Sequence, residues 1–454
     1  MAKTYVIDTN VLIQAPYAFH CFEENHLVLP LVVLEELDGL KKADGERGYN
    51  ARKAIRYLEK LRLQGNLLTG VSLPNGGTLR VEPNCVDVRL PEDLPDDKAD
   101  NLILKVCKSL EASSPVLVTK DLVLRLKAQM MSIEAQDFST EQVIPEEEQY
   151  TGRIQCYASE EAFDHFLEDG LDAETIYQWD ELGHATHPLL LENQFVLIRA
   201  DQSLRKTHLG RVKGNRIIPL EYIRNQPYGI KPRNAGQYFL QEALMKPASE
   251  APLVIVKGQA GTAKTFYSLA VGLEKIFNHP TDEYRRILIC RPNAQFDTDI
   301  GFLPGDEQEK ISPLMRPIMD NLEQLLDANE DERYTNEIEL KSKIDELFDR
   351  NIIQTEALNF IRGRSFIKTY LIIDEAQNMT PNQAKSIITR AGKGTKIILL
   401  GDPNQIDKPF LDERTNGLSY ASEKMKGSPL CFQLTMVADE CERSELALDA
   451  IQRL

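Results

Sequence analysis

The residues that decide the fold of the C-terminal half are Leu253-Val254-Ile255-Val256-Lys257, followed by Gly258-Gln259-Ala260-Gly261-Thr262-Ala263-Lys264-Thr265 and a helical pattern from Phe266. The apolar run predicts a buried strand, and the order strand, glycine-containing loop, helix is typical of a phosphate-binding loop. Glycines allow backbone N–H groups to surround phosphate oxygens, and the start of the helix adds partial positive charge. The sequence therefore predicts a nucleoside triphosphate site.

Two side chains of this loop carry the expected chemistry. Lys264 places a positive charge on the β- and γ-phosphates of ATP, and Thr265 offers a hydroxyl to Mg²⁺. Ala263 stands where the usual pattern has its second glycine, and a positive φ angle there would cost alanine about 1 kcal/mol or more. We regard this cost as tolerable because the other pattern residues remain. The residues predicted to contact ATP are Gly258, Gln259, Ala260, Gly261, Thr262, Ala263, Lys264, Thr265 and Phe266.

Paired carboxylates at a second strand end strengthen this prediction. The apolar residues 370–373 run into Asp374 and Glu375. We expect Asp374 to bind Mg²⁺ and Glu375 to polarise the attacking water. A third strand, residues 397–400, precedes Gln405, whose side chain we expect to sense the γ-phosphate. Upstream, Gln237 stands where its amide could read adenine, and the alternative is a surface glutamine.

Several motifs over about residues 232–454 resemble the PhoH family of P-loop ATPases, relatives of superfamily-one helicase cores. They are the phosphate-binding loop, Ile289-Cys290-Arg291-Pro292, Gly301-Phe302-Leu303-Pro304-Gly305, Arg362-Gly363-Arg364, Asp374-Glu375-Ala376-Gln377-Asn378 and Gly401-Asp402-Pro403-Asn404-Gln405. The resemblance implies a RecA-like domain that hydrolyses ATP with Mg²⁺. Glu442-Arg443-Ser444 is similar to the family's arginine-bearing terminal motif, which makes Arg443 a candidate arginine finger. A surface arginine is the alternative.

The length of chain after the last motif bears on how such a finger would work. Fewer than 50 residues follow Gln405, too few for the second RecA-like domain of a monomeric helicase. An arginine finger would then come from a neighbouring subunit, through a head-to-tail interface that closes into a ring. The family resemblance also implies a homo-oligomeric ring, a hexamer.

Acidic residues in the N-terminal part stand near predicted strand ends or helix starts. They are Asp8, Glu36, Asp100 and Asp121. Strands alternate here with helical patterns, which predicts a mostly parallel sheet whose carboxyl ends gather at one edge. Carboxylates gathered there repel one another unless a divalent cation lies between them, and Mg²⁺ or Mn²⁺ suits oxygen ligands. The alternative is ordinary acidic residues at helix N-termini.

The segments around these acids resemble a PIN domain over about residues 1–140. The segments are Val6-Ile7-Asp8-Thr9-Asn10-Val11-Leu12, Val32-Val33-Leu34-Glu35-Glu36-Leu37, Asp100-Asn101-Leu102-Ile103-Leu104 and Val118-Thr119-Lys120-Asp121. The resemblance implies a metal-dependent ribonuclease with Asp8, Glu36, Asp100 and Asp121 as catalytic metal ligands. Glu36 rather than Glu35 matches the pattern, and Asp96 and Asp97 are alternatives for the third acid. PIN–PhoH fusions are linked to ATP-dependent RNA unwinding and cleavage, and an antitoxin protein is a candidate partner.

Composition limits the remaining classes of protein. The net charge of −17 argues weakly against extended phosphate contacts over the whole surface. Seven cysteines without a Cys-x-x-Cys pair suggest a reducing compartment, and no apolar run approaches a membrane-spanning length. We expect a soluble, cytoplasmic protein without a signal peptide. One segment differs from the acidic chain in its charge: residues 199–233, called here the basic segment. We interpret it either as a surface that binds the RNA backbone, with Tyr222 or Tyr228 stacking on bases, or as a solvated surface or one that docks on an acidic neighbour.

The predicted fold is α/β, with three parts. They are a PIN-like parallel-sheet nuclease domain (1–140), a linker with a small, partly β module (141–232) and a RecA-like, PhoH-like P-loop ATPase domain (233–454). The acidic residues 306–350 read as a solvated helical insertion. The predicted function is an ATP-dependent RNA-processing enzyme, a helicase-type motor joined to an endoribonuclease for single-stranded RNA. The alternatives are an ATP-driven regulatory scaffold with a catalytically silent PIN module, and an ATPase that acts on protein or DNA.

Overall fold

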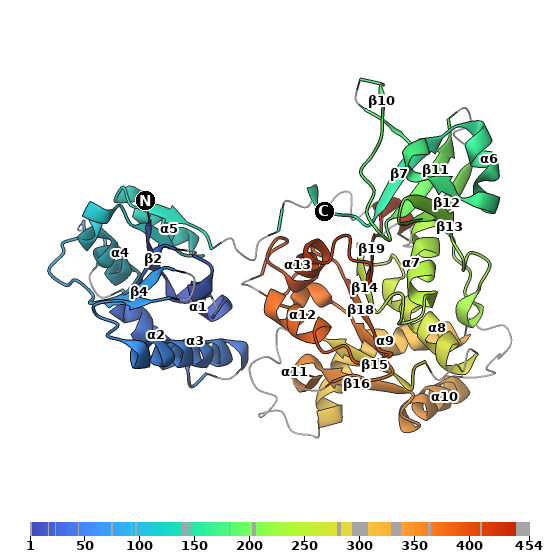
Figure 1. The fold of residues 1–454 in the computed structure, drawn as a ribbon. Coiled ribbons are helices and arrows are strands. Elements are labelled where there is room, and N and C mark those ends of the chain that lie inside the picture. The colour runs from blue at the N-terminus through green and yellow to red at the C-terminus, as the bar shows by residue number, and fades with distance from the viewer. Residues whose placement is uncertain are drawn as a thin grey trace. The chain divides into compact units, whose positions relative to one another are not determined.

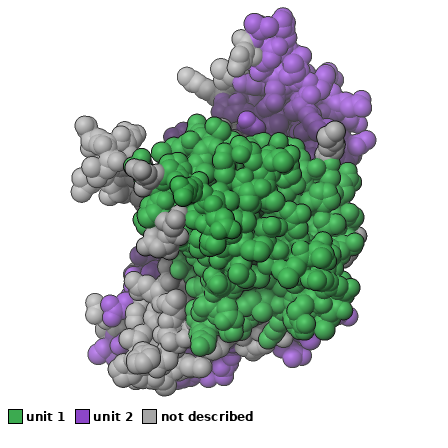
Figure 2. All heavy atoms as spheres, turned by 90° about the vertical axis from the view of Figure 1, so that its left-hand side faces the viewer, with its two compact units in different colours: residues 1–141, 295–302 green, residues 142–294, 303–454 purple. Residues whose placement is uncertain are grey.

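The structure of the chain is a computed structural model. It describes residues 2–16, 18–22, 24–43, 45–73, 76–91, 93–95, 98–138, 143–144, 148–180, 182–201, 206–278, 283–292, 307–327, 337–361, 365–408 and 411–441. The described residues fall into two compact units that divide between residues 141 and 142 (Figure 2). Within the described ranges, no helix combines the length and the apolar character needed to cross a membrane.

Unit 1 is an α/β unit built on a mainly parallel sheet (Figure 1). In spatial order its strands are β3 (Val71–Ser72), β4 (Thr78–Glu82), β2 (His26–Pro30), β1 (Thr4–Ile7), β5 (Val116–Val118) and β6 (Glu134–Gln136). Its helices are α1 (Thr9–Gln14), α2 (Leu31–Leu40), α3 (Gly45–Gln64), α4 (Ala99–Ser109) and α5 (Leu122–Met130). Only β3 and β4 pair antiparallel among these strands. The parallel pairs place the carboxyl ends of β1, β2 and β5 at one edge.

The larger part of unit 2 is a parallel sheet covered on both faces. The strands in spatial order are β16 (Ile353–Ala357), β15 (Arg286–Arg291), β17 (Thr369–Ile373), β18 (Lys396–Gly401), β14 (Leu253–Lys257) and β19 (Cys431–Thr435). One face packs on α7 (Ala235–Met245), α8 (Lys264–Phe277), α9 (Glu307–Asp327) and α10 (Glu337–Asp349). The other packs on α11 (Leu358–Ile361), α12 (Pro381–Ile388) and α13 (Gly417–Lys424). Burial on both faces explains why these strands read as continuous apolar runs.

A second sheet lies in the same unit and begins near residue 150. Its strands are β7 (Arg153–Ala158), β11 (Phe195–Ala200), β12 (Thr207–Lys213), β13 (Arg216–Pro219) and β8 (Leu171–Asp172). Helix α6 (Glu160–Asp169) packs on one face, and β9 (Gln178–Trp179) pairs with β10 (Ala185–Thr186) in a short hairpin (Figure 1). Gly214 and Asn215 form a two-residue turn between β12 and β13, because Lys213 pairs with Arg216 across it.

One expectation drawn from local patterns was wrong. The acidic segment 306–350 is not a solvated insertion, since α9 and α10 bury Ile318, Leu322 and Leu347 in the main core of unit 2. Charged residues on the outer face of these helices hid their apolar stripe. In unit 1, β2 ends at Pro30, and Glu36 lies within α2.

Candidate nucleotide site and candidate metal site

The phosphate-binding loop connects β14 to α8 and has the backbone shape that its glycines predict. Gly261 has φ of 88°, and Ala263 adopts a left-handed conformation with φ of 60° and ψ of 21°. Position 263 is thus a glycine-type position occupied by alanine, at a cost of about 1 kcal/mol. Gly258 is held by close packing, because a Cβ atom there would lie 2.7 Å from the Cβ of Met436.

Replacing Ala263 with glycine should therefore stabilise unit 2. The glycine removes the left-handed strain but adds entropy to the unfolded chain, so we expect a net gain of about 0.5–1 kcal/mol, or roughly 2–4 °C at most for a unit of this size. Differential scanning calorimetry of the full chain measures this shift. A lower transition temperature for unit 2 would contradict the loop conformation described above.

Lys264 opens α8 and is folded back over the loop. Its Nζ donates to the carbonyl oxygens of Gly258 at 2.6 Å and Gln259 at 2.8 Å, and to Oγ1 of Thr262 at 3.3 Å. Burial lowers the pKa of the Lys264 amine, whereas the negative charges of Asp402 and Asp374 act against that shift. Phosphate oxygens could replace these loop acceptors without moving the lysine out of the loop. Ala260, Gly261 and Phe266 complete the predicted loop set and are not fully buried.

A charged network joins the loop to the next strand ends. Thr265 Oγ1 donates to Asp374 Oδ1 at 2.9 Å. Arg291, at the end of β15, lies 3.2 Å from Asp374 Oδ2 through Nε and 2.8 Å from Glu375 Oε1 through Nη2. Burial raises the pKa of Asp374, and the Arg291 charge opposes that rise. The Thr265 hydroxyl and the Asp374 carboxylate, which are predicted to bind Mg²⁺, thus lie together. Arg291 links them to the Glu375 carboxylate, which is predicted to polarise water.

Arg291 is a candidate site residue to which the sequence analysis gave no role. The signal was present, because an arginine directly after an apolar strand falls at the carboxyl edge of a parallel sheet. Its role depends on β15 lying next to β17, which brings Arg291 to the two carboxylates. That strand order is not visible in the sequence.

The third strand end is linked to the same network through Gln377. Its amide nitrogen donates to Glu375 Oε2 at 2.6 Å and to the backbone oxygen of Gln405 at 2.8 Å. Its amide oxygen accepts from the backbone N–H of Asp402 at 3.2 Å. The side chain of Gln405 is exposed. Gln377 therefore connects Glu375 to the segment predicted to sense the γ-phosphate.

Gln237 and Glu440 hold the segment upstream of the loop. Gln237 is buried, and its amide oxygen accepts from the backbone N–H of Arg233 at 2.9 Å, so this atom is engaged away from any base. Glu440 accepts from the backbone N–H of Gly236 at 2.7 Å and from Arg153 of β7 at 2.8 Å through both oxygens. The neighbouring Cys441 Sγ donates to the loop oxygen of Ala260 at 3.4 Å. The neighbouring residues Glu440 and Cys441 therefore contact strand β7 and the phosphate-binding loop, respectively.

Arg443 and the segments 301–305 and 362–364 lie outside the described residues.

In unit 1, the charges of two predicted acids, Glu36 and Asp100, act on a third, Asp8. Asp8 follows β1, Glu36 lies on α2, and Asp100 lies in the first turn of α4. The pKa of Asp8 is raised to about 6, mainly by burial and in smaller part by the charges of Glu36 and Asp100, while hydrogen bonds from Thr119 and the Thr9 backbone lower it. Asp100 also forms an ion pair with Lys127 of α5, with 2.9 Å between Nζ and Oδ2.

Threonines rather than a fourth acid surround Asp8. Thr119 Oγ1 donates to Asp8 Oδ2 at 2.6 Å, and Thr9 Oγ1 donates to Glu36 Oε2. Asp121 instead caps α5, since its Oδ1 accepts from the backbone N–H groups of Val123 and Leu124. Thr9 and Thr119 stand within the segments that resemble a PIN domain, but neither had a predicted role. Asp96 and Asp97, the alternatives for the third acid, lie outside the described residues.

The donor set of unit 1 suits a divalent cation in its chemistry. The pKa of the buried Asp8 carboxylate is raised partly by the charges of two other carboxylates. A divalent cation would neutralise these charges and so remove the repulsion between them. Asp8, Glu36 and Asp100 would hold such a cation. As they stand, the described residues contain no group of three or more His, Cys, Asp or Glu side chains drawn close enough to hold a metal ion.

The basic segment, residues 199–233, does not form one continuous basic track. Arg211 is buried, donates to Asn193 Oδ1 at 2.9 Å and lies over the ring of Phe432. Tyr228, one of the two residues expected to stack on RNA, is also buried. Tyr222 remains partly exposed, and Arg205 lies outside the described residues.

Comparisons with known proteins agree with the two-part reading of the chain. A family model described as PhoH-like protein matches residues 229–454, and one described as PIN domain matches residues 5–139. Protein PhoH2 of Bacillus subtilis is 38% identical over 460 residues, covering 98% of this chain and 98% of that protein. Protein PhoH2 of Thermobispora bispora and of Mycolicibacterium smegmatis are each 32% identical, covering 98% of this chain and 95% of theirs.

Proposed function

The chain belongs to the family of PhoH2 proteins, with a PIN domain followed by a PhoH-like P-loop domain, and we propose that it is an ATP-dependent RNA-processing enzyme. In this proposal unit 2 is an Mg²⁺-dependent ATPase that moves or unwinds RNA. Unit 1 is a metal-dependent endoribonuclease that cuts single-stranded RNA. Both would work in the cytoplasm.

The observation that carries the ATPase proposal is the charged network beside the loop. Lys264 would bind the β- and γ-phosphates, and Thr265 and Asp374 would hold Mg²⁺, which would neutralise charge on the transferred phosphoryl group. Glu375 orients a water and accepts its proton, while Arg291 and Gln377 fix the carboxylate in place. We assign no adenine contact to the buried Gln237 amide oxygen, and Gln405 would act through the Gln377 link.

Replacing Glu375 with glutamine should separate ATP binding from hydrolysis. The amide keeps the shape and the contact with Gln377 but cannot accept a proton, so we expect a loss of roughly 10²–10⁴-fold in ATP turnover. ATP affinity, measured with a non-hydrolysed analogue, should change little. Glu413→Gln, an exposed glutamate of the same unit, is the control and should retain wild-type turnover. Wild-type turnover in Glu375→Gln would remove this residue from the mechanism.

For the nuclease, the proposal rests on the buried carboxylate of Asp8, on which the charges of Glu36 and Asp100 act. Asp8, Glu36 and Asp100 would bind Mg²⁺ or Mn²⁺ and thereby place a water against a phosphodiester. Asp121 would bind the cation only if its side chain no longer capped α5. The direct test is cleavage of a single-stranded RNA by the full chain with Mn²⁺ or Mg²⁺, with a chelator, and with and without ATP.

A ring of subunits, a hexamer, completes the proposal. The described part of unit 2 holds one parallel sheet with one phosphate-binding loop, so an arginine finger, Arg443, would reach ATP from a neighbouring subunit. Native mass spectrometry of the full chain measures the assembly. A monomer at working concentration, with full ATP turnover, would contradict this arrangement.

One observation favours a second candidate function, an ATP-driven scaffold with a silent PIN module. Asp100 is neutralised by Lys127, and the described residues show no ready group of three metal ligands. A silent module predicts RNA binding without metal-dependent cleavage. The cleavage assay above distinguishes the two functions.

A further inference from the structure

A cavity of about 880 Å³ lies at the amino edge of the parallel sheet in unit 2. Its walls come from the segments that enter the strands: Pro247 before β14, Glu283 before β15, Lys368 before β17 and Lys393 before β18. The residues assigned to ATP lie after the opposite, carboxyl ends of these strands. The cavity is therefore separate from the candidate ATP site.

Lys368 and Lys393 form one side of this cavity. No described residue pairs with the ammonium group of Lys368 or Lys393, and the segments that carry them are joined by a backbone hydrogen bond of 3.1 Å from Lys368 N to Lys393 O. Lys368 itself is left-handed, with φ of 49°, although it is not glycine. Non-glycine residues held in this conformation cluster at ligand-binding positions, because the strain costs about 1 kcal/mol or more. In a chain of net charge −17, this pair is a local cationic patch.

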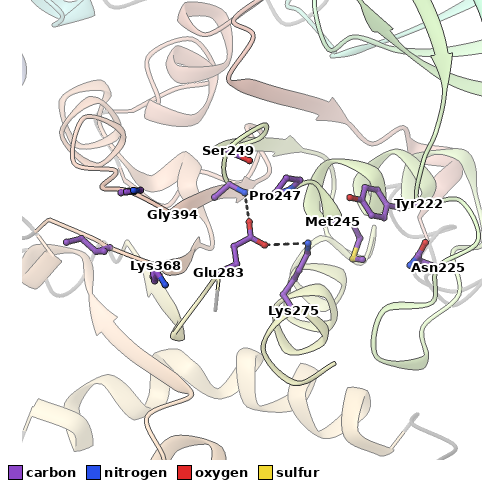
Figure 3. Close-up of a pocket in the computed structure, with 12 residues that line it drawn as sticks. Tyr222, Asn225, Met245, Pro247, Ser249, Lys275, Glu283, Lys368 and Gly394 are labelled. Carbon is purple, nitrogen blue, oxygen red and sulfur yellow. Dashed lines mark hydrogen bonds and ion pairs between the residues drawn. The ribbon is translucent and has the colours of Figure 1, made fainter. Parts of the chain in front are cut away.

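The other side of the cavity is partly apolar. Figure 3 shows Tyr222, Asn225 and Met245 on this side, with Lys368 and Gly394 across from them. Between the two sides Glu283 lies 3.6 Å from Lys275 and accepts from the backbone N–H of Ala248 at 2.6 Å. Lys275 is thus neutralised, and the net positive charge remains with Lys368 and Lys393.

These features together select a class of ligand. A volume of about 880 Å³ is within the roughly 300–1,000 Å³ of small-molecule sites. Lysine ammonium groups bind phosphate as point charges, an aromatic ring stacks on a base, and an asparagine amide can hydrogen-bond to the edge of a base. We propose that this cavity is a second binding site, for a nucleoside phosphate, with the phosphate at Lys368 and Lys393 and the base at Tyr222 and Asn225.

A nucleoside phosphate could reach this site as a free nucleotide or as the phosphorylated end of an RNA strand. The site chemistry is the same for both, because each presents a base next to a terminal phosphate. The proposal does not depend on ATP hydrolysis, since its residues lie at the opposite edge of the sheet. Its test can therefore read binding alone.

The test is photo-crosslinking of the full chain with 8-azido-ADP, followed by peptide mapping, together with equilibrium dialysis of ADP. We expect two nucleotides per chain and a labelled peptide around Tyr222, besides label near the phosphate-binding loop. Lys368→Glu combined with Lys393→Glu should weaken the second site roughly tenfold or more and remove the Tyr222 label. Lys424→Glu combined with Lys426→Glu, a matched pair of exposed lysines, should change neither.

Competition identifies the source of the ligand. Displacement of the Tyr222 label by a short 5′-phosphorylated RNA, but not by the same RNA with a 5′-hydroxyl, assigns the site to an RNA end. Displacement by free nucleotides alone assigns it to a free ligand. Label and stoichiometry that are equal in the wild type and in the Lys368/Lys393 variant overturn the proposal. The Lys264→Ala variant, tested in parallel, should lose the loop label and keep the Tyr222 label.

Discussion

ATP turnover of Lys264→Ala is expected to fall by roughly 10²–10³-fold or more. In the structure Lys264 Nζ sits within 2.6–2.8 Å of the Gly258 and Gln259 carbonyl oxygens, so the charge is already in the loop before ATP binds. Such a preorganised charge stabilises the negative oxygens that develop during phosphoryl transfer. Burial lowers the pKa of this lysine, but Asp402 and Asp374 oppose that shift, which favours the charged form. Alanine removes the charge and leaves the loop carbonyls without their donor.

The control for this variant is an exposed lysine of the same unit. Lys385→Ala, on α12, should keep wild-type turnover. Calorimetry should show that unit 2 of Lys264→Ala still unfolds cooperatively, which separates lost chemistry from lost folding. Turnover near the wild-type rate in a folded Lys264→Ala protein would place the hydrolytic site elsewhere.

Mixing variants tests whether sites are shared between subunits. Lys264→Ala and Arg443→Ala should each be inactive alone. If Arg443 acts on the ATP of a neighbour, mixed assemblies contain some interfaces with both native residues and should regain part of the turnover. No regain in assemblies shown to have exchanged subunits would contradict the trans-acting arginine.

Local patterns predicted the elements of the sheet more fully than they predicted the site. The strands at residues 253–256, 287–289, 370–373 and 396–400 were readable because strands buried on both faces are continuous apolar runs. The phosphate-binding loop was readable because its function depends on consecutive residues. The left-handed φ of Ala263 followed from the same pattern, because this residue stands where the pattern usually has a glycine.

The parts that were not predictable depend on contacts between distant residues. Arg291 joins Asp374 and Glu375 only because β15 and β17 are neighbours in the sheet. Arg211 looked like a surface cation, yet it is buried against Phe432 and Asn193. The cavity at the amino edge has no sequence motif at all, because residues from segments that lie far apart in the chain contribute to it. Charge and composition describe a segment, whereas burial depends on what packs against it.

RNA cleavage by Asp8→Asn is expected to be lost, while the same change should stabilise unit 1 in the absence of metal. Asparagine keeps the size of Asp8 and a partner for Thr119, but it removes the buried negative charge that a divalent cation requires. The wild type should gain thermal stability with Mn²⁺, by about 2–3 kcal/mol at a hundredfold excess over the dissociation constant. Asp8→Asn should gain much less. Asp87→Asn, an exposed carboxylate of unit 1, should behave as the wild type.

The stabilisation has a defined pH dependence because the pKa of Asp8 is raised from 3.8 to about 6 on folding. As pH rises between these values, the unfolded state releases the proton first, so the free energy of unfolding of the wild type falls. Above about pH 6 the loss is complete and amounts to about 3 kcal/mol, from roughly two pKa units of 1.36 kcal/mol each. The advantage of Asp8→Asn over the wild type, measured by calorimetry with a chelator, should therefore be large at pH 7–8 and shrink towards pH 4. If the difference in stability between Asp8→Asn and the wild type did not change with pH, the pKa of Asp8 would not be raised in the folded state. The electrostatic repulsion that we expect a cation to relieve would then be absent.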